Sequence, residues 1–493
     1  MTEPEERPEQ ERIRRDKLDR LQASGVEGYP VGVRRTTTTA ALRTSHPDLA
    51  PDTATGERVS IAGRVVLKRD GGKLCFATLR DGTGDLQVML SLDQLGETRL
   101  EDWKRDVDLG DHVSVDGEVV ASRRGELSVM AQAWTMASKA LRPLPEKWAG
   151  IADDEERVRR RYLDLVVNPD ARRIVEARAA VLRSLRATLD ARAYVEVETP
   201  ILQTLHGGAA ARPFETHLNA FDLPMYLRIA LELWLKRLVV GGFERVYEIG
   251  RTFRNEGVDT THSAEFTMLE AYEAYGDYDT MADLTRALVV NAATTLGVTV
   301  VPASDGSEID LTAPWRTVTV FGAVSEALGT AVTIETSRED LIKLAATREI
   351  ALRPDWDAGE IVLELYEQLV EDHLIQPTFV RDYPASVRPL ARPHRDDPRL
   401  AEAWDLVING VELAPAYSEL VDPVEQRRRL TEQAAKAAGG DPEAMQLDED
   451  FLRALEHGAP PMGGMGLGVD RLVMLLTGVN IREAITFPLL RPE

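Results

Sequence analysis

Residues 243–257 read Phe243-Glu-Arg-Val-Tyr-Glu-Ile-Gly-Arg-Thr-Phe-Arg254-Asn-Glu-Gly257, an alternating run that ends in polar residues. A second alternating run covers 265–272, and the polar loop 255–264 separates the two. This pattern predicts a long β-hairpin. Because the side chains of a strand alternate between its faces, four residues are expected to share one side: Phe266, Met268, Glu270 and Tyr272.

A glycine-rich segment further along the chain reads Gly464-Met-Gly-Leu-Gly468-Val-Asp-Arg471 and predicts a strand that enters a helix. An arginine beside a glycine-containing segment is suited to gripping a polyphosphate, because glycine removes steric interference. We expect Arg254 to hold an α-phosphate and Arg471, at the start of its helix, to hold the terminal phosphate. His262 lies on the hairpin loop, near the expected leaving phosphates.

Two carboxylates are predicted to lie close together in the segment 404–413. Asn409-Gly410 between apolar runs indicates a two-residue hairpin turn, which pairs Val407 with Glu412. In that register Asp405 and Glu412 lie diagonally on one face. A pair of solvated acids on an exposed face is the alternative, and the phosphate-binding segments favour a Mg²⁺ ion that bridges phosphates of ATP.

A third group of residues is acidic and aromatic, and comprises Glu232, Glu270, Tyr272, Tyr417 and Glu419. Three buried carboxylates are costly unless a ligand brings positive charge. One glutamate suits an α-amino group, and the others, with the tyrosine rings, suit an ε-ammonium. On charge alone the favoured ligand is lysine.

The rest of the chain predicts further domains. Five short strands between Val59 and Ala131, separated by Asp-Gly and Gly-Gly turns, favour an OB-fold barrel over 56–145. Residues 1–55 form a helical extension and connector, 146–170 a linker, and 171–493 an α+β domain. That last domain begins with a helix near 172–192 and a strand over Tyr194–Pro200.

Composition excludes several classes of protein. The net charge of −23 argues against indiscriminate coating of nucleic acid, and the single cysteine, Cys75, excludes an intrachain disulfide and a cysteine-rich zinc site. No apolar run approaches the roughly 20 residues that span a bilayer, so we expect a cytoplasmic protein without membrane contact.

With these segments in view, the chain resembles the bacterial class II lysyl-tRNA synthetases over nearly its whole length. The resemblance rests on the hairpin and glycine segments above and on five further stretches: Gly207–Phe214, Leu233–Val246, Leu374–Phe379, Ala140–Pro145, and Asn480–Glu483 with Phe487-Pro488. It implies an N-terminal OB-fold β-barrel followed by a class II synthetase catalytic domain, an antiparallel sheet flanked by helices. It also implies a homodimer, built by the helix and strand before Pro200, that charges tRNA(Lys) with lysine using ATP.

The resemblance assigns roles to individual residues. ATP would contact Arg254, Glu256, His262, Phe266 and Arg471, of which Arg254, Arg471, Glu256 and His262 are the expected catalytic residues. Asp405 and Glu412 would hold Mg²⁺. The lysine site would be lined by Gly208, Glu232, Glu270, Tyr272, Tyr417 and Glu419. In the barrel, Phe76 and Gln87, with Arg69 nearby, would stack on and read anticodon bases.

The chain departs from the usual family pattern at Leu231, Thr261, Pro415 and Ala133. Three hypotheses therefore follow. The first is a working lysyl-tRNA synthetase. The second is a paralogue that adenylates lysine or an analogue for another acceptor or for inhibitor tolerance. The third is an RNA-binding or regulatory protein without catalysis, against which the retained arginines and acids argue.

Overall fold

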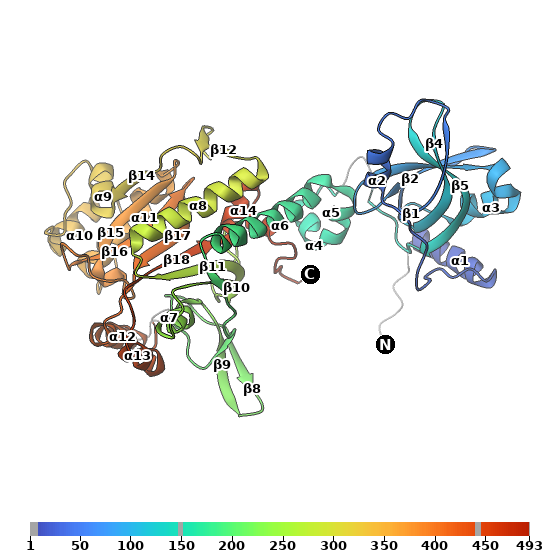
Figure 1. Cartoon of the computed structure of the whole chain (residues 1–493). Coiled ribbons are helices and arrows are strands. Elements are labelled where there is room, and N and C mark those ends of the chain that lie inside the picture. Colours follow the sequence, from blue (N-terminus) through green and yellow to red (C-terminus); the bar gives the residue numbers. More distant parts are fainter. Residues whose placement is uncertain (1–7, 146–150, 439–444, 493) are drawn as a thin grey trace. The chain divides into compact units, whose positions relative to one another are not determined.

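The structure is a computed structural model that describes residues 8–145, 151–438 and 445–492 (Figure 1). The chain divides into two compact units, one ending at Ala152 and the other beginning at Asp153. Within the described ranges, no helix is both long enough and apolar enough to cross a bilayer.

The N-terminal unit is a closed barrel of five strands in the order β1-β2-β3-β5-β4, which confirms the predicted OB-fold. Alternation explains the barrel: in β2, Cys75, Ala77 and Leu79 are buried inside, whereas Phe76 between them is half-buried. Its elements are α1 (Glu9–Ala23), α2 (Thr39–Ser45), β1 (Ala54–Arg69), β2 (Leu74–Arg80), β3 (Asp85–Ser91), α3 (Leu92–Asp106), β4 (His112–Ala121) and β5 (Leu127–Ser138).

The second unit is built on an eight-stranded sheet in the order β14-β15-β16-β17-β18-β11-β10-β6. Only the edge strands β14 and β6 pair in parallel among these strands, and all inner pairs are antiparallel. The predicted α+β class is confirmed. The strands are β6 (Val195–Glu196), β10 (Arg245–Phe253), β11 (Glu265–Ala274), β14 (Arg316–Thr319), β15 (Thr378–Pro384), β16 (Leu400–Ile408), β17 (Val411–Ser418) and β18 (Met462–Gly468).

Helices cover the two faces of this sheet differently. On one face, α6 (Pro169–Asp190), α8 (Tyr278–Leu296) and α14 (Val469–Thr477) share a core with Leu269 and Leu406 (Figure 1). On the other, α7 (Glu232–Val240) packs near Tyr272 at the β10–β11 end, and α9 (Val320–Leu328), α10 (Arg338–Thr347) and α11 (Ala358–Leu369) pack near Val407. Strand alternation places Glu270 of β11 and Asp405 of β16 on this second face.

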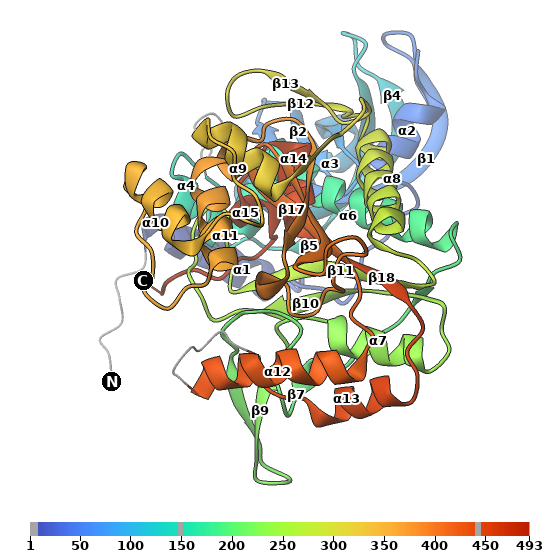
Figure 2. The ribbon, with the colours of Figure 1, turned by 90° about the vertical axis from the view of Figure 1, so that its left-hand side faces the viewer.

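Smaller elements complete the unit. The sheet β7-β9-β8 ends in a hairpin that projects below α12 and α13 in Figure 2. These elements are α4 (Asp154–Arg159), α5 (Arg161–Val167), β7 (Leu202–Gln203), β8 (Glu215–Leu218), β9 (Leu223–Leu227), β12 (Val300–Pro302), β13 (Glu308–Asp310), η1 (Glu371–His373), η2 (Ala385–Val387), α12 (Pro423–Ala438), α13 (Glu449–Glu456) and α15 (Ile481–Ala484).

Two local predictions need comment. The strand predicted over Tyr194–Pro200 is wrong beyond Val195–Glu196, because the backbone N–H and hydroxyl of Thr199 donate to the carboxylate of Glu248 at 3.0 and 2.6 Å. That side chain replaces a neighbouring strand as the hydrogen-bond partner. In the predicted linker 146–170, residues 146–150 lie outside the described residues, and α4 and α5 occupy most of the remainder.

The Asn409-Gly410 turn joins β16 to β17 with φ of +57° and +71°, as a type I′ turn requires. We predict that Gly410→Ala lowers the free energy of unfolding by about 1–3 kcal/mol, because its methyl group would lie 2.8 Å from the carbonyl oxygen of Asp372 at a strained φ. Urea unfolding followed by tryptophan fluorescence measures the loss. The control is Gly306→Ala, which has a φ of +86° but no neighbour within 4 Å. Equal losses would show that the contact with Asp372 contributes nothing.

Candidate active site

A small cavity of about 150 Å³ gathers the expected ATP-binding residues on the face of the sheet that carries α7. Strand alternation in β11 turns Phe266 and Met268 toward it, and the last glycine of β18 brings in the start of α14. The residues expected at ATP that line it, together with one expected metal ligand, are Arg254, Glu256, His262, Phe266, Arg471 and Glu412.

The two arginines enter this cavity from different elements. Arg254 follows β10, and its guanidinium carbon lies 5.3 Å from the centre of the Phe266 ring. Its Nε is buried and has no hydrogen-bond partner, which is costly unless a ligand supplies an acceptor. Arg471 lies in the first turn of α14, where its Nη1 donates to the carbonyl oxygen of Glu412 at 2.6 Å. The cavity thus presents positive charge suited to phosphate groups.

His262 is fixed on the hairpin loop by Asp259. The Asp259 carboxylate accepts the backbone N–H groups of Thr261 and His262, each at 2.7 Å, and lies 3.0 Å from Nδ1 of His262. The hydrogen bond from the Thr261 backbone is the largest of several that hold the pKa of Asp259 well below its ordinary value. With Nδ1 engaged by Asp259, Nε2 is the ring nitrogen available to a ligand.

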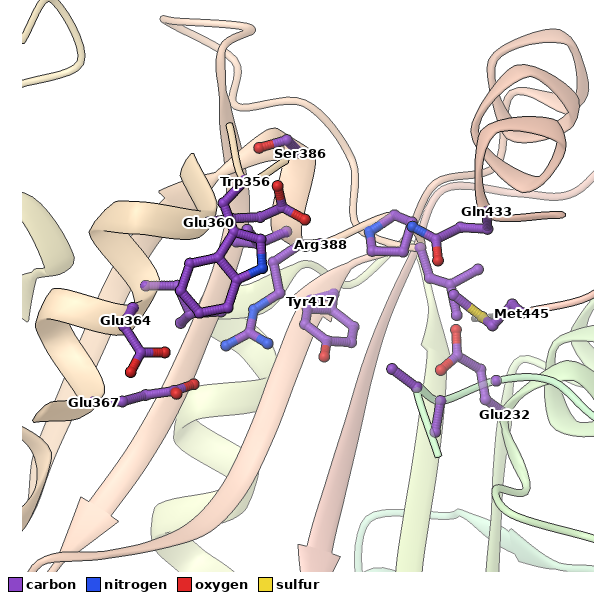
Figure 3. A pocket seen from close by; sticks show the side chains of 17 residues that line it. Glu232, Trp356, Glu360, Glu364, Glu367, Ser386, Arg388, Tyr417, Gln433 and Met445 are labelled. Carbon is purple, nitrogen blue, oxygen red and sulfur yellow. The ribbon is translucent and has the colours of Figure 1, made fainter. Parts of the chain in front are cut away.

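A second cavity, of about 380 Å³, contains three of the expected lysine-site residues: Gly208, Glu232 and Tyr417. Figure 3 shows Glu232 on one side of it and the α11 residues Glu364 and Glu367 on the other, with Arg388 and Tyr417 between them. This cavity is therefore predominantly acidic, with one arginine near its centre.

The remaining lysine-site residues are buried close to Glu232. Glu232, Glu270 and Glu419 are 5%, 6% and 2% exposed, so three carboxylates share a region from which water is largely excluded. Glu270 accepts the backbone N–H of Leu231 at 3.0 Å and the hydroxyl of Tyr272 at 3.2 Å. These two hydrogen bonds offset only part of the free energy lost when the Glu270 carboxylate is removed from water.

A lysine that the sequence analysis did not consider lies among these acids. The ammonium of Lys236 is 2.5 Å from Oε1 of Glu232 and 2.5 Å from Oε2 of Glu419, and the residue is 1% exposed. The sequence signal was the i,i+4 spacing from Glu232 on one helix. Its second partner, Glu419, is far away in the sequence and had no such signal.

Burial shifts the titration of these acids. It raises the pKa of Glu270 to about 7, although the hydrogen bond from Leu231 opposes the shift. Burial likewise raises the pKa of Glu419, against the attraction of Lys236. In the absence of a further cation, these carboxyl groups are therefore partly protonated near neutral pH.

The expected metal ligands occupy the hairpin as predicted, since Val407 pairs with Glu412. Asp405 accepts a hydrogen bond from Arg388 on Oδ2, and its buried Oδ1 has no partner of good hydrogen-bond geometry among the described residues. Burial raises the pKa of Asp405, and the charge of Glu412 adds to the shift. Among residues 8–145, 151–438 and 445–492, no three histidine, cysteine or acidic side chains form a metal-binding group. An ion held here would need ligands from phosphate or water.

Comparison with known proteins places this arrangement in a family. The model of the class II tRNA synthetases (D, K and N) matches residues 153–491, and the model of the OB-fold nucleic acid binding domain matches residues 59–137. The chain belongs to the class II tRNA synthetases.

Three relatives named as lysine–tRNA ligases match this synthetase over almost their full length. The chain is 56% identical to lysine–tRNA ligase of Kineococcus radiotolerans over 492 residues, and 54% identical to that of Mycolicibacterium gilvum over 492 residues. It is 52% identical to lysine–tRNA ligase 1 of Mycobacterium tuberculosis over 497 residues. Each alignment covers 99% of this chain and 98% of the relative.

The expected anticodon residues of the synthetase lie on the outer surface of its barrel. Arg69 of β1 pairs with Phe76 of β2, and Phe76 in turn pairs with Met89, two residues from Gln87 on β3. The neighbours of Phe76 on β2 point into the core, so its ring is directed outward. The three residues therefore share one region of the barrel.

Two further residues of the synthetase site escaped the sequence analysis. Asp259, which fixes His262, belongs to an Asp-Thr-Thr sequence typical of polar turns, so that pattern could have indicated it. Arg388 follows η2 and reaches Asp405 on β16, and nothing in the local sequence indicates that pairing. Such contacts arise only when distant segments pack together.

Gly464 of β18 leaves room for two residues of the expected lysine site. A Cβ at Gly464 would lie 2.0 Å from Oε1 of Glu419 and 2.4 Å from the Tyr272 ring. We therefore predict that Gly464→Ala raises the KM for the amino acid at least tenfold while leaving the KM for ATP within about twofold, measured by ATP–pyrophosphate exchange. The control is Gly466→Ala on the same strand. Its Cβ would lie 3.1 Å from the flexible end of the Met268 side chain, and its next neighbours in the described chain are 3.8 Å away. Equal effects of the two variants would contradict the assigned site.

Proposed function

We propose that this synthetase is a lysine–tRNA ligase, which activates L-lysine with ATP to lysyl-adenylate and transfers lysine to the 3′ end of tRNA(Lys). One observation carries the choice of amino acid: three buried carboxylates surround a site that holds a single internal ammonium. A ligand with two ammonium groups offsets the remaining negative charge. The lysine–tRNA ligases among its relatives support the same substrate.

The first step joins the amino acid to AMP. An oxygen of the lysine carboxylate attacks the α-phosphorus of ATP, and the bond from that phosphorus to the bridging oxygen breaks, so that the electron pair leaves with pyrophosphate. Arg254 binds the α-phosphate, Arg471 binds the terminal phosphate, and Nε2 of His262 faces the leaving group. Phe266 stacks on the adenine ring, and Glu256 contacts the nucleotide at the same cavity.

The second step uses the adenylate. A hydroxyl of the terminal ribose of tRNA attacks the lysyl carbonyl carbon, and the bond to the phosphate oxygen breaks to release AMP. In this step Glu232, Glu270 and Glu419 hold the amino groups of lysine in place. Phe76, Gln87 and Arg69 on the barrel read the anticodon, because an exposed aromatic ring beside polar groups is suited to an unstacked base.

Asp405 and Glu412 are the residues that would hold Mg²⁺. They fit this ion because carboxylate oxygens are its preferred protein ligands and because the buried Oδ1 of Asp405 has no partner of good hydrogen-bond geometry among the described residues. When bound there, Mg²⁺ offsets negative charge on the ATP phosphates. Arg388 already neutralises part of the charge of Asp405.

We further infer a cytoplasmic homodimer. The segment that follows α6 exposes large apolar side chains, with Val195, Ile201, Leu202 and Leu205 each more than 40% exposed in the single chain. Contiguous exposed apolar side chains mark interaction surfaces in soluble proteins, and this segment begins in the helix and strand before Pro200 that the family resemblance assigns to the dimer.

The proposed function is tested by ATP–pyrophosphate exchange with L-lysine, L-ornithine, L-arginine and L-aspartate, followed by charging of tRNA(Lys). We predict the highest kcat/KM for lysine. We also predict that Arg254→Ala lowers the rate of lysine-dependent exchange roughly 100-fold or more, because a phosphate contact is removed. The control is Arg251→Ala, an arginine on the same strand whose guanidinium pairs with Glu265 at 3.5 Å. Exchange with none of the four amino acids would contradict the proposal, and lysine exchange without charging of tRNA would favour a different acceptor.

A further inference from the structure

Lys236 occupies an unusual position for a lysine. It lies on α7 one turn after Glu232, and its ammonium contacts Glu232 from the same helix and Glu419 from the end of β17, both at 2.5 Å. A buried ammonium costs several kcal/mol of lost hydration unless acidic partners compensate. The two ion pairs supply that compensation, and they also join helix α7 to the sheet across the lysine site.

The ion pairs leave part of the acidic site open to a ligand. Oε1 of Glu419 is buried near the backbone of Gly464 and the Tyr272 ring, and it has no hydrogen-bond partner within the part of the chain that the structure describes. Glu270 is bonded only to the Leu231 N–H and the Tyr272 hydroxyl among its described partners. Three carboxylates and one ammonium therefore leave two negative charges in excess when all are ionised.

We propose that Lys236 is a positioning residue that holds Glu232 and Glu419 at a fixed separation and favours their ionised forms, so that the site accepts an amino acid with two ammonium groups. This inference rests on the proposed function, because the ligand it selects is the substrate of that reaction. Lys236 itself does not contact the reacting atoms. It sets the charge that the substrate must match.

The electrostatic surroundings give this role a distinctive signature. The charged and titratable groups that face the site come from several elements: Glu232 and Lys236 on α7, Glu270 and Tyr272 on β11, Tyr417 of β17 with Glu419 just after it, Arg254, Arg388, and Glu364 and Glu367 on α11. Burial raises the pKa of Glu419, and Lys236 is the strongest group that opposes this shift. Removing the ammonium would raise the pKa of Glu419 further, and a protonated carboxyl group binds an ammonium poorly.

The test measures KM for L-lysine and for ATP by pyrophosphate exchange between pH 6 and 9 in the wild type, Lys236→Met and Lys236→Arg. In the wild type, KM for lysine should fall as pH rises through about 8, where Glu419 ionises. In Lys236→Met this fall should move about one pH unit or more to higher pH, with KM at pH 7 raised about tenfold. KM for ATP should change less than twofold, and Lys236→Arg should restore the wild-type pH profile because it keeps the charge.

The control is Lys139→Met in the barrel. Lys139 is also fully buried and also contacts two carboxylates, those of Asp108 and Asp111 at 2.6 and 2.7 Å, but it lies in the other unit. Exchange involves no tRNA, so this variant should lose stability without a change in KM for lysine. If Lys236→Met lacks a cooperative thermal transition, Lys236→Gln replaces it with the same expectation.

The outcomes separate this inference from the proposed function. A wild type that exchanges with lysine, together with an unshifted pH profile in the neutral variants, overturns the role of Lys236 and leaves the function standing. A pH profile that Lys236→Arg fails to restore also overturns it, because a shape effect then replaces the charge effect. No lysine-dependent exchange in the wild type overturns the proposed function, and the inference with it.

Discussion

Excess negative charge buried beside a nucleotide cavity is the constraint on which this active site depends. Glu232, Glu270 and Glu419 are almost completely removed from water; Lys236 pairs with the first and the last of them, and the charge of Arg254 acts on Glu270. Desolvation of each ion costs several kcal/mol, so burying three carboxylates beside too few cations is unfavourable. A cationic substrate lowers this electrostatic free energy, which makes charge matching the basis of specificity.

The fold forms this site by placing an acidic region and an arginine-lined cavity on one face of the same sheet. Strand β18 contributes glycines where Glu419 and Tyr272 need room, and the start of α14 places Arg471 at the nucleotide cavity. Helix α7 covers one end of the face and α11 covers the other. In the proposed function the amino acid lies among acids and the phosphates among arginines. We infer that this separation directs the carboxylate of the substrate toward ATP.

Local patterns predicted those parts of the structure that depend on neighbouring residues. Alternation predicted the shared face of Phe266, Met268, Glu270 and Tyr272 on β11, and Asn409-Gly410 predicted the pairing of Val407 with Glu412, because backbone geometry alone determines both. Beyond that pair the register shifts by one residue, so that Leu406 pairs with Ala414, which the turn did not predict. The strand predicted after Tyr194 failed because the Glu248 side chain took its hydrogen bonds. The pairs Lys236–Glu419 and Arg388–Asp405 could not be read from the sequence, since each joins segments that meet only in the folded protein.

The central claim is that the acidic site is partly protonated until a cation enters it. Calorimetric titration of the protein with L-lysine at pH 7, in buffers of different ionisation enthalpy, counts the protons exchanged on binding. Because burial raises the pKa of Glu270 to about 7, the account predicts release of roughly half a proton or more per lysine bound. A binding enthalpy that does not depend on the buffer, or an uptake of protons, would contradict it.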